Sequence, residues 1–490
     1  MKKNPNGNLN ERPVVFFIFG ATGDLAAKKI IPALFNLYGK KALPKNFKIV
    51  GFARKDYNGG KFAEYSAEIV KKRFGENVPE KELKSFRKLF EYHQGQLPDM
   101  AAYASLAEKV KKMDGKSGDT CDKIFYLSIA PEFYGTVLEN IAASGLDSSK
   151  TRGGGRARII IEKPFGDNLK SAQKIEALIG RLFNEDQIYR IDHYLGKEML
   201  QNILAFRFAN NLLESSWSNK TIESINISLL EELGVEHRGA FYDAVGAFRD
   251  VGQNHLLQAL ALITMERPKK YDADSIIKNR AELLEQLIPP SGKAVTSSAF
   301  RAQYKGYGKI EGVKPSSRTE TYFKVKAALS SPRWKGVPII LEGGKRMGER
   351  LKEIVVSFKP ASPLSGLGSS RGLPRKAGEA AGGIACQSEL VFRWEPEERI
   401  KIKFCSKKPG AKAEVEGREF DFFYRDSSER VQYVEEYEKL ISDCLAGDRT
   451  HFISAREIYA MWKFADAVVR GWEKNLAPLH SYEPGSKNFS

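Results

Sequence analysis

Three small residues, Gly20, Gly23 and Ala26, follow a GxxGxxA spacing between an apolar run and a helical pattern. Small side chains at this spacing allow a tight turn and let a pyrophosphate approach the backbone closely. The free N–H groups at the start of a helix attract the same anion. The spacing therefore predicts a dinucleotide site, and an ordinary strand-to-helix turn is the alternative interpretation.

Arg54 follows the next apolar run, and the first carboxylate after it is Asp56. NAD-binding proteins of this class place an acid at that strand end for the ribose 2′-hydroxyl, whereas NADP-binding proteins place an arginine nearby. A guanidinium matches the oxygens of a 2′-phosphate. Arg54 therefore favours NADP, with NAD as a possible second cofactor and an exposed surface arginine as the structural alternative.

Oxidation of an alcohol by a nicotinamide requires a base that takes the hydroxyl proton, and histidine suits this role near neutral pH. Among the six histidines, only His193 and His255 lie in segments rich in other polar residues. His255 shares a helical face with apolar residues, so a hydrogen-bonded core histidine is the alternative. A carboxylate such as Asp192 would orient the ring of the base.

The elements that must position these residues alternate between strands and helices over the first 190 residues. Strands are expected at 13–19, 47–52, 123–129, 158–161 and 187–191, with helices at 62–74, 103–113 and 170–183 between them. This alternation predicts an α/β fold, a Rossmann doubly wound parallel sheet spanning residues 1–192. Ligands of such sheets lie beyond the carboxyl ends of the strands, where Lys163 and Asp192 are expected.

A different pattern follows from residue 193 to residue 490. A long helix is expected at 242–264, with strands of alternating polarity at 224–231, 320–327, 353–358, 389–394 and 399–404. These elements predict a larger α+β domain with an antiparallel sheet. The Gly- and Ser-rich segment 360–387 is interpreted as an atypical loop between two strands.

Composition excludes several classes of protein. The formal charge is +17 over 490 residues, but the basic residues are dispersed, so nucleic-acid binding is kept only as the non-enzyme alternative. No run approaches the ~20 apolar residues of a membrane span, and no signal peptide is recognisable, so a cytoplasmic protein is expected. The four cysteines lack CxxC or histidine spacing, so neither zinc, any other metal, nor a disulfide is expected.

Four strings resemble, in order and spacing, the motifs of the glucose-6-phosphate dehydrogenase family. They are Gly20-Ala21-Thr22-Gly23-Asp24-Leu25-Ala26, Glu162-Lys163-Pro164-Phe165-Gly166, the string from Arg190 to Glu198, and the string from Arg249 to His255. The resemblance continues through Leu341 to Lys345, Lys407 to Gly410 and Tyr482 to Ser486, so it covers nearly the whole chain.

The resemblance implies a reaction, the first step of the oxidative pentose phosphate pathway. His255 would remove the C1 hydroxyl proton of glucose 6-phosphate with Asp192 as its partner, and the hydride would pass to NADP, giving 6-phosphogluconolactone. The family also implies a homodimer or homotetramer built from the sheet domain. Implied substrate-binding residues are Lys163, His193, Tyr194, Lys197, Glu231, Asp250, Lys345 and Arg350; implied cofactor-binding residues are Gly20 to Leu25, Lys29, Arg54 and Lys163.

The sequence also departs from the family pattern. Ala27 stands where many members have a basic residue, so the preference for NADP rests mainly on Arg54. Leu351 and Val355 replace basic residues that bind a second, structural NADP in animal enzymes, so no such site is expected. His237 stands at a position that is usually glycine. A sugar or inositol dehydrogenase of the glucose-fructose oxidoreductase class is the alternative enzyme, and the string from Arg190 to Lys197 distinguishes the two.

Overall fold

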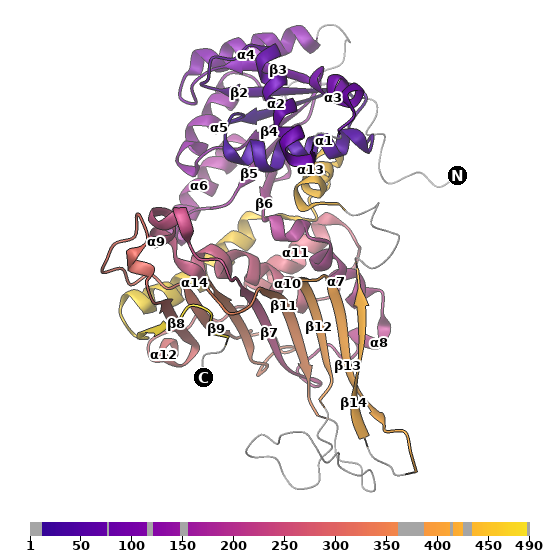
Figure 1. Cartoon of the computed structure of the whole chain (residues 1–490), viewed down its shortest axis with the longest axis vertical. Helices are drawn as coiled ribbons and strands as arrows, with labels where there is room; N and C mark the ends of the chain where they lie inside the picture. Colours follow the sequence, from indigo (N-terminus) through magenta and orange to yellow (C-terminus); the bar gives the residue numbers. More distant parts are fainter. Residues whose placement is uncertain are drawn as a thin grey trace. The chain divides into compact units, whose positions relative to one another are not determined.

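The structure is a computed structural model that describes residues 12–75, 78–114, 121–147, 155–360, 387–411, 415–424 and 434–487. The chain divides into two compact units (Figure 1). The N-terminal unit comprises Met1–Lys197, Lys270–Ile277 and Val434–Ile458, and the C-terminal unit comprises Glu198–Lys269, Lys278–Tyr433 and Tyr459–Ser490. This division differs from the single boundary after residue 192 because two later segments pack with the N-terminal unit.

A sheet of seven strands, counted over the described residues, forms the centre of the N-terminal unit. Its order is β15-β6-β5-β4-β1-β2-β3, and every pair is parallel except β15 with β6. The doubly wound parallel sheet is thereby confirmed, although β3 was not expected from the sequence. The strands are β1 (Val14–Phe19), β2 (Phe47–Ala53), β3 (Phe90–Gln94), β4 (Asp122–Leu127), β5 (Ala157–Glu162), β6 (Ile188–Ile191) and β15 (Phe452–Ile453).

Both faces of this sheet are covered by helices, which explains the uninterrupted apolar run of β1. Phe16 and Ile18 belong to a core that includes residues of α1 and α2, whereas Phe19 stacks on Tyr103 of α4. The helices are η1 (Ala26–Ile30), α1 (Ile31–Gly39), α2 (Gly59–Phe74), α3 (Glu80–Arg87), α4 (Met100–Asp114), η2 (Pro131–Phe133), α5 (Tyr134–Ala143), α6 (Leu169–Leu182), η4 (Glu185–Gln187), η5 (His193–Gly196) and α13 (Glu436–Ala446).

A buried arginine anchors β6. Arg190 binds the Glu176 carboxylate at 3.0 and 2.6 Å and the Glu185 carboxylate at 2.8 and 2.9 Å. Its side chain is 1% exposed, so the guanidinium charge has to be matched by partners inside the protein. The arginine that opens the string from Arg190 to Glu198 therefore has a structural role, and it fixes the strand that ends just before Asp192.

The C-terminal unit contains a mostly antiparallel sheet, as the sequence predicted. Nine described strands are ordered β14-β13-β12-β11-β7-β10-β9-β8-β16, with parallel pairing only between β7 and β10 and between β8 and β16. They are β7 (Ile222–Leu230), β8 (Ala299–Tyr304), β9 (Tyr322–Ala327), β10 (Ile339–Gly344), β11 (Leu351–Phe358), β12 (Glu389–Glu395), β13 (Arg399–Lys407), β14 (Val415–Phe423) and β16 (Leu479–Tyr482).

The expected helix at 242–264 consists of three consecutive elements, α9 (Gly239–Ala247), η7 (Phe248–Leu256) and α10 (Leu257–Thr264). The chain breaks at Gly246, whose φ is 79° and whose Cβ, if present, would meet the Glu320 carboxylate at 2.5 Å. The same carboxylate accepts a hydrogen bond from the Phe248 amide at 3.0 Å. The prediction of a single helix was therefore wrong, because Glu320, which is distant in the sequence, caps the start of a second helical segment.

The remaining helical segments are α7 (Glu198–Phe208), α8 (Asn211–Glu214), η6 (Glu236–Arg238), α11 (Ala273–Leu284), α12 (Ala294–Ser298), η8 (Tyr307–Lys309) and α14 (Ala455–Glu473). None of the helices in the described ranges is both long and apolar enough to cross a bilayer. Cys405 in β13 is disulfide-bonded, so the expectation of no disulfide was wrong at this residue. The segment 360–387 lies, apart from its two end residues, outside the described residues.

Candidate active site

The glycine-rich turn occupies a narrow space between two strand ends. Gly20 has a φ of 80°, and its amide donates a hydrogen bond to the Phe52 carbonyl of β2 at 2.9 Å. A Cβ at Gly20 would lie 2.2 Å from the carbonyl oxygen of Ser128, which follows β4. Both the backbone angle and the close approach of another chain segment therefore require glycine at this position.

The residues after Gly20 close the turn and begin the helix. The Gly23 amide donates to the Gly20 carbonyl at 2.9 Å, and the chain enters the π-helical turn η1 before continuing as α1. Ala21 and Ala26 are buried, Thr22 and Leu25 are half-buried, and Gly23 and Asp24 are exposed. Asp24 pairs with Lys28 at 2.8 Å. The exposed backbone at Gly23 leaves room for a phosphate to approach.

Arg54 is exposed at the end of β2, beside the glycine turn. Register pairs Phe52 of β2 with Phe19 of β1, so Arg54 lies two residues beyond the level at which the turn begins. The backbone there is held by Tyr92, whose hydroxyl donates to the carbonyls of Ala53 at 2.9 Å and Lys55 at 2.7 Å. The guanidinium thus emerges from a fixed strand end at the edge where the turn lies.

Lys29 projects from η1 toward the start of α13, a helix that the chain reaches some 400 residues later. Its ammonium lies 3.1 Å from Glu436 Oε1 and 5.4 Å from the ring centroid of Tyr437. Burial raises the pKa of Glu436, but the charges of Lys197 and Lys29 outweigh this effect and leave that pKa below its usual value. The carboxylate is therefore the counter-charge for two lysines expected to bind phosphates.

Lys163 follows β5 directly, and the peptide bond between Lys163 and Pro164 is cis. The preceding residue, Glu162, is buried, and its carboxylate accepts a hydrogen bond from the Tyr126 hydroxyl at 2.5 Å. The Tyr134 hydroxyl donates to the Glu162 backbone carbonyl at 2.9 Å. The strand end that carries Lys163 is thus held through both the side chain and the backbone of its neighbour.

The segment after β6 forms the short helix η5. Asp192 caps it, since Asp192 Oδ1 accepts a hydrogen bond from the Tyr194 amide at 3.0 Å. The His193 ring stacks on Tyr437 with centroids 6.3 Å apart, and the Lys197 ammonium lies 5.4 Å from the ring centroid of Tyr194. Parallel pairing therefore brings the expected residues of the N-terminal unit to one edge of its sheet.

The C-terminal unit brings together Glu231, Asp250 and Lys345. Because β7 and β10 are parallel and pair Leu230 with Gly344, the next residues of the two strands, Glu231 and Lys345, are neighbours. The Lys345 ammonium binds the Glu231 carboxylate and lies 3.9 Å from Asp250 Oδ2. These three residues, expected to contact the sugar, form one charged cluster.

Arg350 belongs to an adjoining group of charges. Its Nε lies 2.7 Å from Glu395 Oε2, and Lys352 lies 3.0 Å from the same oxygen and 3.9 Å from Glu231 Oε1. Arg350 is 60% exposed, whereas Lys352 is 10% exposed. Lys352 and Glu395 were missed from the sequence, because no motif marks them and only strand pairing makes them neighbours.

His255 lies in η7 and is 2% exposed. Its amide donates to the Asn254 side chain at 2.7 Å. Asp250 lies on the same helical element, so the string from Arg249 to His255 supplies both a histidine and a carboxylate to the C-terminal unit. Asp192 belongs to the N-terminal unit, and its pairing with His255 stays a prediction.

Comparison with known proteins gives a match over almost the whole chain. Residues 17–202 match the family model described as the NAD binding domain of glucose-6-phosphate dehydrogenase, and residues 204–490 match the model of its C-terminal domain. Glucose-6-phosphate 1-dehydrogenase of Chlamydia pneumoniae is 36% identical over 487 residues, covering 97% of this chain and 92% of that protein. The Bacillus subtilis protein of the same name is 35% identical, covering 97% and 95%.

A solved structure described as glucose-6-phosphate dehydrogenase in complex with its substrate glucose 6-phosphate is also similar. It superposes with a TM-score of 0.87 at 31% sequence identity, covering 98% of this chain and 96% of that one. Sequence and fold therefore agree over nearly the full length of both proteins.

We predict that Gly20→Ala destabilises the protein by more than its backbone angle alone explains. Gly145 provides the matched control, because its φ is +72° and a Cβ there would meet nothing within 4 Å. Gly145→Ala is expected to lower the free energy of unfolding by about 1–2 kcal/mol, the cost of a left-handed alanine. Gly20→Ala should cost more in urea titrations, because its Cβ collides with the Ser128 carbonyl; an equal or smaller cost would contradict this account.

Proposed function

Because this chain belongs to the glucose-6-phosphate dehydrogenase family, we propose that it oxidises D-glucose 6-phosphate at C1 to 6-phospho-D-glucono-1,5-lactone, with NADP as the hydride acceptor. This is the first step of the oxidative pentose phosphate pathway. One observation carries the proposal: the glycine turn, Lys163 and the segment from Asp192 to Lys197 follow strands of one parallel sheet at its carboxyl edge. That edge is where α/β sheets bind their ligands. A cytoplasmic location is part of the same proposal.

The chemistry requires a base and an acceptor. NADP, when bound, accepts the hydride from C1. His255 takes the C1 hydroxyl proton, and the electron pair of the O–H bond forms the lactone carbonyl as the C–H bond breaks. Asp192 orients the imidazole and stabilises its protonated form. Because His255 is only 2% exposed, bulk water has little access to the ring that takes the proton.

Binding of the sugar phosphate is divided among several side chains. Lys197, His193 and Tyr194 offer an ammonium, a ring N–H and a hydroxyl to the phosphate. Glu231, Asp250 and Lys345 bind sugar hydroxyls with a cluster whose charges are already paired. Lys163 lies between sugar and cofactor, and Arg350 adds positive charge on the phosphate side. A site with its own group of phosphate-binding side chains suits a phosphorylated substrate.

Gly20 to Leu25 and Lys29 hold the cofactor diphosphate, and Arg54 selects NADP through its 2′-phosphate. Arg54 is exposed at a strand end whose backbone is fixed, so its guanidinium is accessible to an anion. A second, structural NADP is not part of the proposal.

The direct test is turnover of the purified protein. Reduced nicotinamide should accumulate with glucose 6-phosphate and NADP, and the product should be identified as the lactone by its mass and by its hydrolysis to the acid. A protein that turns over an unphosphorylated sugar or an inositol instead would replace this proposal with the alternative dehydrogenase class.

We predict that His255→Asn lowers kcat by about 1,000-fold or more, while binding of glucose 6-phosphate changes little. Asparagine is smaller than histidine but keeps a hydrogen-bonding group, and it cannot take a proton. Steady-state kinetics give kcat, and titration calorimetry gives the Kd of the substrate. His480→Asn, which changes an exposed histidine on β16, is the control. A His255→Asn variant with near-normal kcat would remove His255 from the role of base.

The predicted preference for NADP is tested by the variant Arg54→Ala. Loss of the guanidinium should raise KM for NADP by about tenfold or more and leave KM for NAD nearly unchanged, because only NADP carries the 2′-phosphate. Lys55→Ala, which removes another exposed cation next in the chain, is the matched control. Equal effects of the two variants on the NADP-to-NAD ratio would show that Arg54 contributes only general positive charge.

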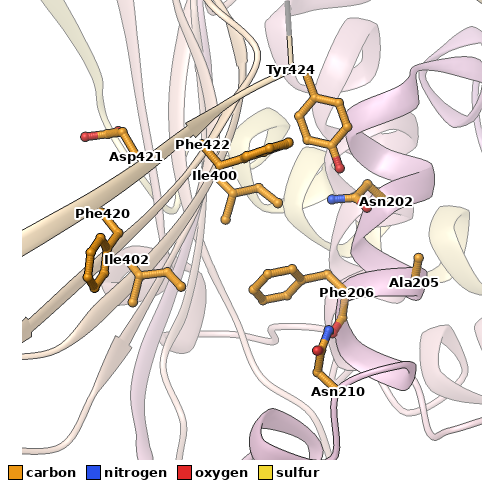
Figure 2. Close-up of a pocket in the computed structure, with 10 residues that line it drawn as sticks. All are labelled: Asn202, Ala205, Phe206, Asn210, Ile400, Ile402, Phe420, Asp421, Phe422 and Tyr424. Atoms are coloured by element: carbon orange, nitrogen blue, oxygen red, sulfur yellow. The ribbon is translucent and has the colours of Figure 1, made fainter. Parts of the chain in front are cut away.

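We also propose a homo-oligomer that uses the outer strands of the C-terminal sheet. β14 is the edge strand of the described sheet, and it exposes Phe420 (66%) and Phe422 (60%). These residues and Ile402 line an apolar pocket beside Phe206 of α7 (Figure 2). An exposed apolar edge strand is a template for pairing, and a second copy of this chain would cover it.

Light scattering should accordingly give at least a dimer for the native chain. Phe420→Glu should shift the mass toward the monomer, because a carboxylate would be buried in the contact. Ile288→Glu, at a residue 50% exposed elsewhere in the same unit, should leave the mass unchanged. A native monomer, or a Phe420→Glu oligomer as stable as the native one, would contradict this surface.

A further inference from the structure

Glu162 is a buried acid to which the proposed reaction gives no role. It is the last residue of β5, 8% exposed, and it directly precedes Lys163. Burying a carboxylate at such a site costs free energy unless its oxygens accept hydrogen bonds or pair with a positive charge. The contacts of Glu162 therefore indicate what keeps it there.

Tyrosines from three different elements hold Glu162. The Tyr126 hydroxyl of β4 donates a hydrogen bond to Glu162 Oε1 at 2.5 Å, and Tyr437 of α13 forms a second hydrogen bond with the carboxylate. Tyr134 of α5 donates to the backbone carbonyl at 2.9 Å. The side chain and the backbone of Glu162 are therefore both fixed, which limits the positions available to Lys163.

Tyr437 also connects Glu162 to other expected site residues. Its ring stacks on His193, and the Lys29 ammonium lies 5.4 Å from its centroid. Figure 1 shows α13 beside α1, where Glu438 of α13 binds Lys40 at 2.5 Å. The hydroxyl that reaches Glu162 is thus supplied by a helix that belongs to the N-terminal unit although it lies late in the sequence.

The charges around Glu162 act in opposite directions. Burial raises the pKa of Glu162 to about 7, although hydrogen bonds from Tyr126 and Tyr437 and the positive charge of Lys163 lower it. The negative charge of Asp192 raises that pKa. The positive charge of Lys163 therefore favours the ionised form of the buried carboxylate.

We propose that Glu162 is a positioning residue of the reaction: its carboxylate, held by the hydroxyls of Tyr126 and Tyr437, and its backbone carbonyl, held by Tyr134, fix the strand end from which Lys163 projects. The inference rests on the proposed function, which places Lys163 between the sugar and the cofactor. Glu162 acts through Lys163 and does not itself contact either ligand.

The first test compares Glu162→Gln with the native protein. Glutamine keeps the shape and removes the charge, so kcat should fall about tenfold or more, while KM for glucose 6-phosphate changes less than about threefold. Tyr437→Phe should also lower kcat, but by a smaller factor than Glu162→Gln. The matched control is Tyr189→Phe, at a buried tyrosine of β6 whose hydroxyl interacts with Arg158, and it should keep its kcat. An unchanged kcat in Glu162→Gln would overturn the proposal.

Stability separates this role from a purely structural one. Because the pKa of Glu162 is raised from 4.5 to about 7 in the folded state, the folded protein holds a proton there that the unfolded chain has lost. The stability from this group is present below about pH 4.5 and is lost as the pH rises to about 7. At about pH 8, Glu162→Gln should therefore unfold at the same or a higher urea concentration. A lower midpoint accompanying the loss of kcat would indicate a structural role instead.

A chemical measurement tests the contact without any turnover. Competitive acetylation followed by peptide mass spectrometry compares the reactivity of individual lysines. In Glu162→Gln the strand end that carries Lys163 is held less firmly, so Lys163 should react severalfold faster at about pH 8, while Lys345 in the C-terminal unit should react as before. Unchanged reactivity of Lys163 would overturn the inference. A native protein inactive toward glucose 6-phosphate would refute the proposed function, and the acetylation result would still stand on its own.

Discussion

Parallel pairing in the seven-stranded sheet is the constraint on which the N-terminal half of the candidate site depends. Since the carboxyl ends of parallel strands lie at one edge of a sheet, the residues following β1, β2, β5 and β6 line the same edge although they span residues 20 to 197. Helices cover both faces of the sheet, so the strands are apolar along their length and polar residues are concentrated at their ends. Gly20 can turn between β2 and β4 only because it has no side chain.

In both units, positively charged side chains of the candidate site are paired with carboxylates. Lys29 is paired with Glu436, Lys345 with Glu231, and Lys352 and Arg350 with Glu395. A paired lysine has lost part of its conformational freedom before any ligand arrives, which lowers the entropic cost of binding an anion. The carboxylates also limit the positive charge at the site. The arrangement therefore favours a ligand that makes directional contacts with several groups over a simple anion.

Local patterns predicted the parts of the fold that depend on neighbouring residues. The apolar run before Gly20, the strand ends at Glu162 and Ile191, and the cluster of polar residues from Arg249 to His255 could all be recognised in this way. Contacts between distant segments could not. Nothing near Glu436 or Tyr437 marks them as partners of Lys29 and Glu162, and the break at Gly246 depends on Glu320. Likewise, the pairing of β7 with β10, which makes Glu231 and Lys345 neighbours, follows from the topology of the second sheet.

The central claim is that this protein is a dehydrogenase built for a phosphorylated sugar. The most direct measurement is the ratio of kcat/KM for glucose 6-phosphate to kcat/KM for glucose, with the same cofactor and the same preparation. The account predicts a ratio of about 1,000 or more, because Lys197 and its neighbours would be left without their anion when glucose binds. A ratio near unity, or turnover of glucose alone, would contradict it.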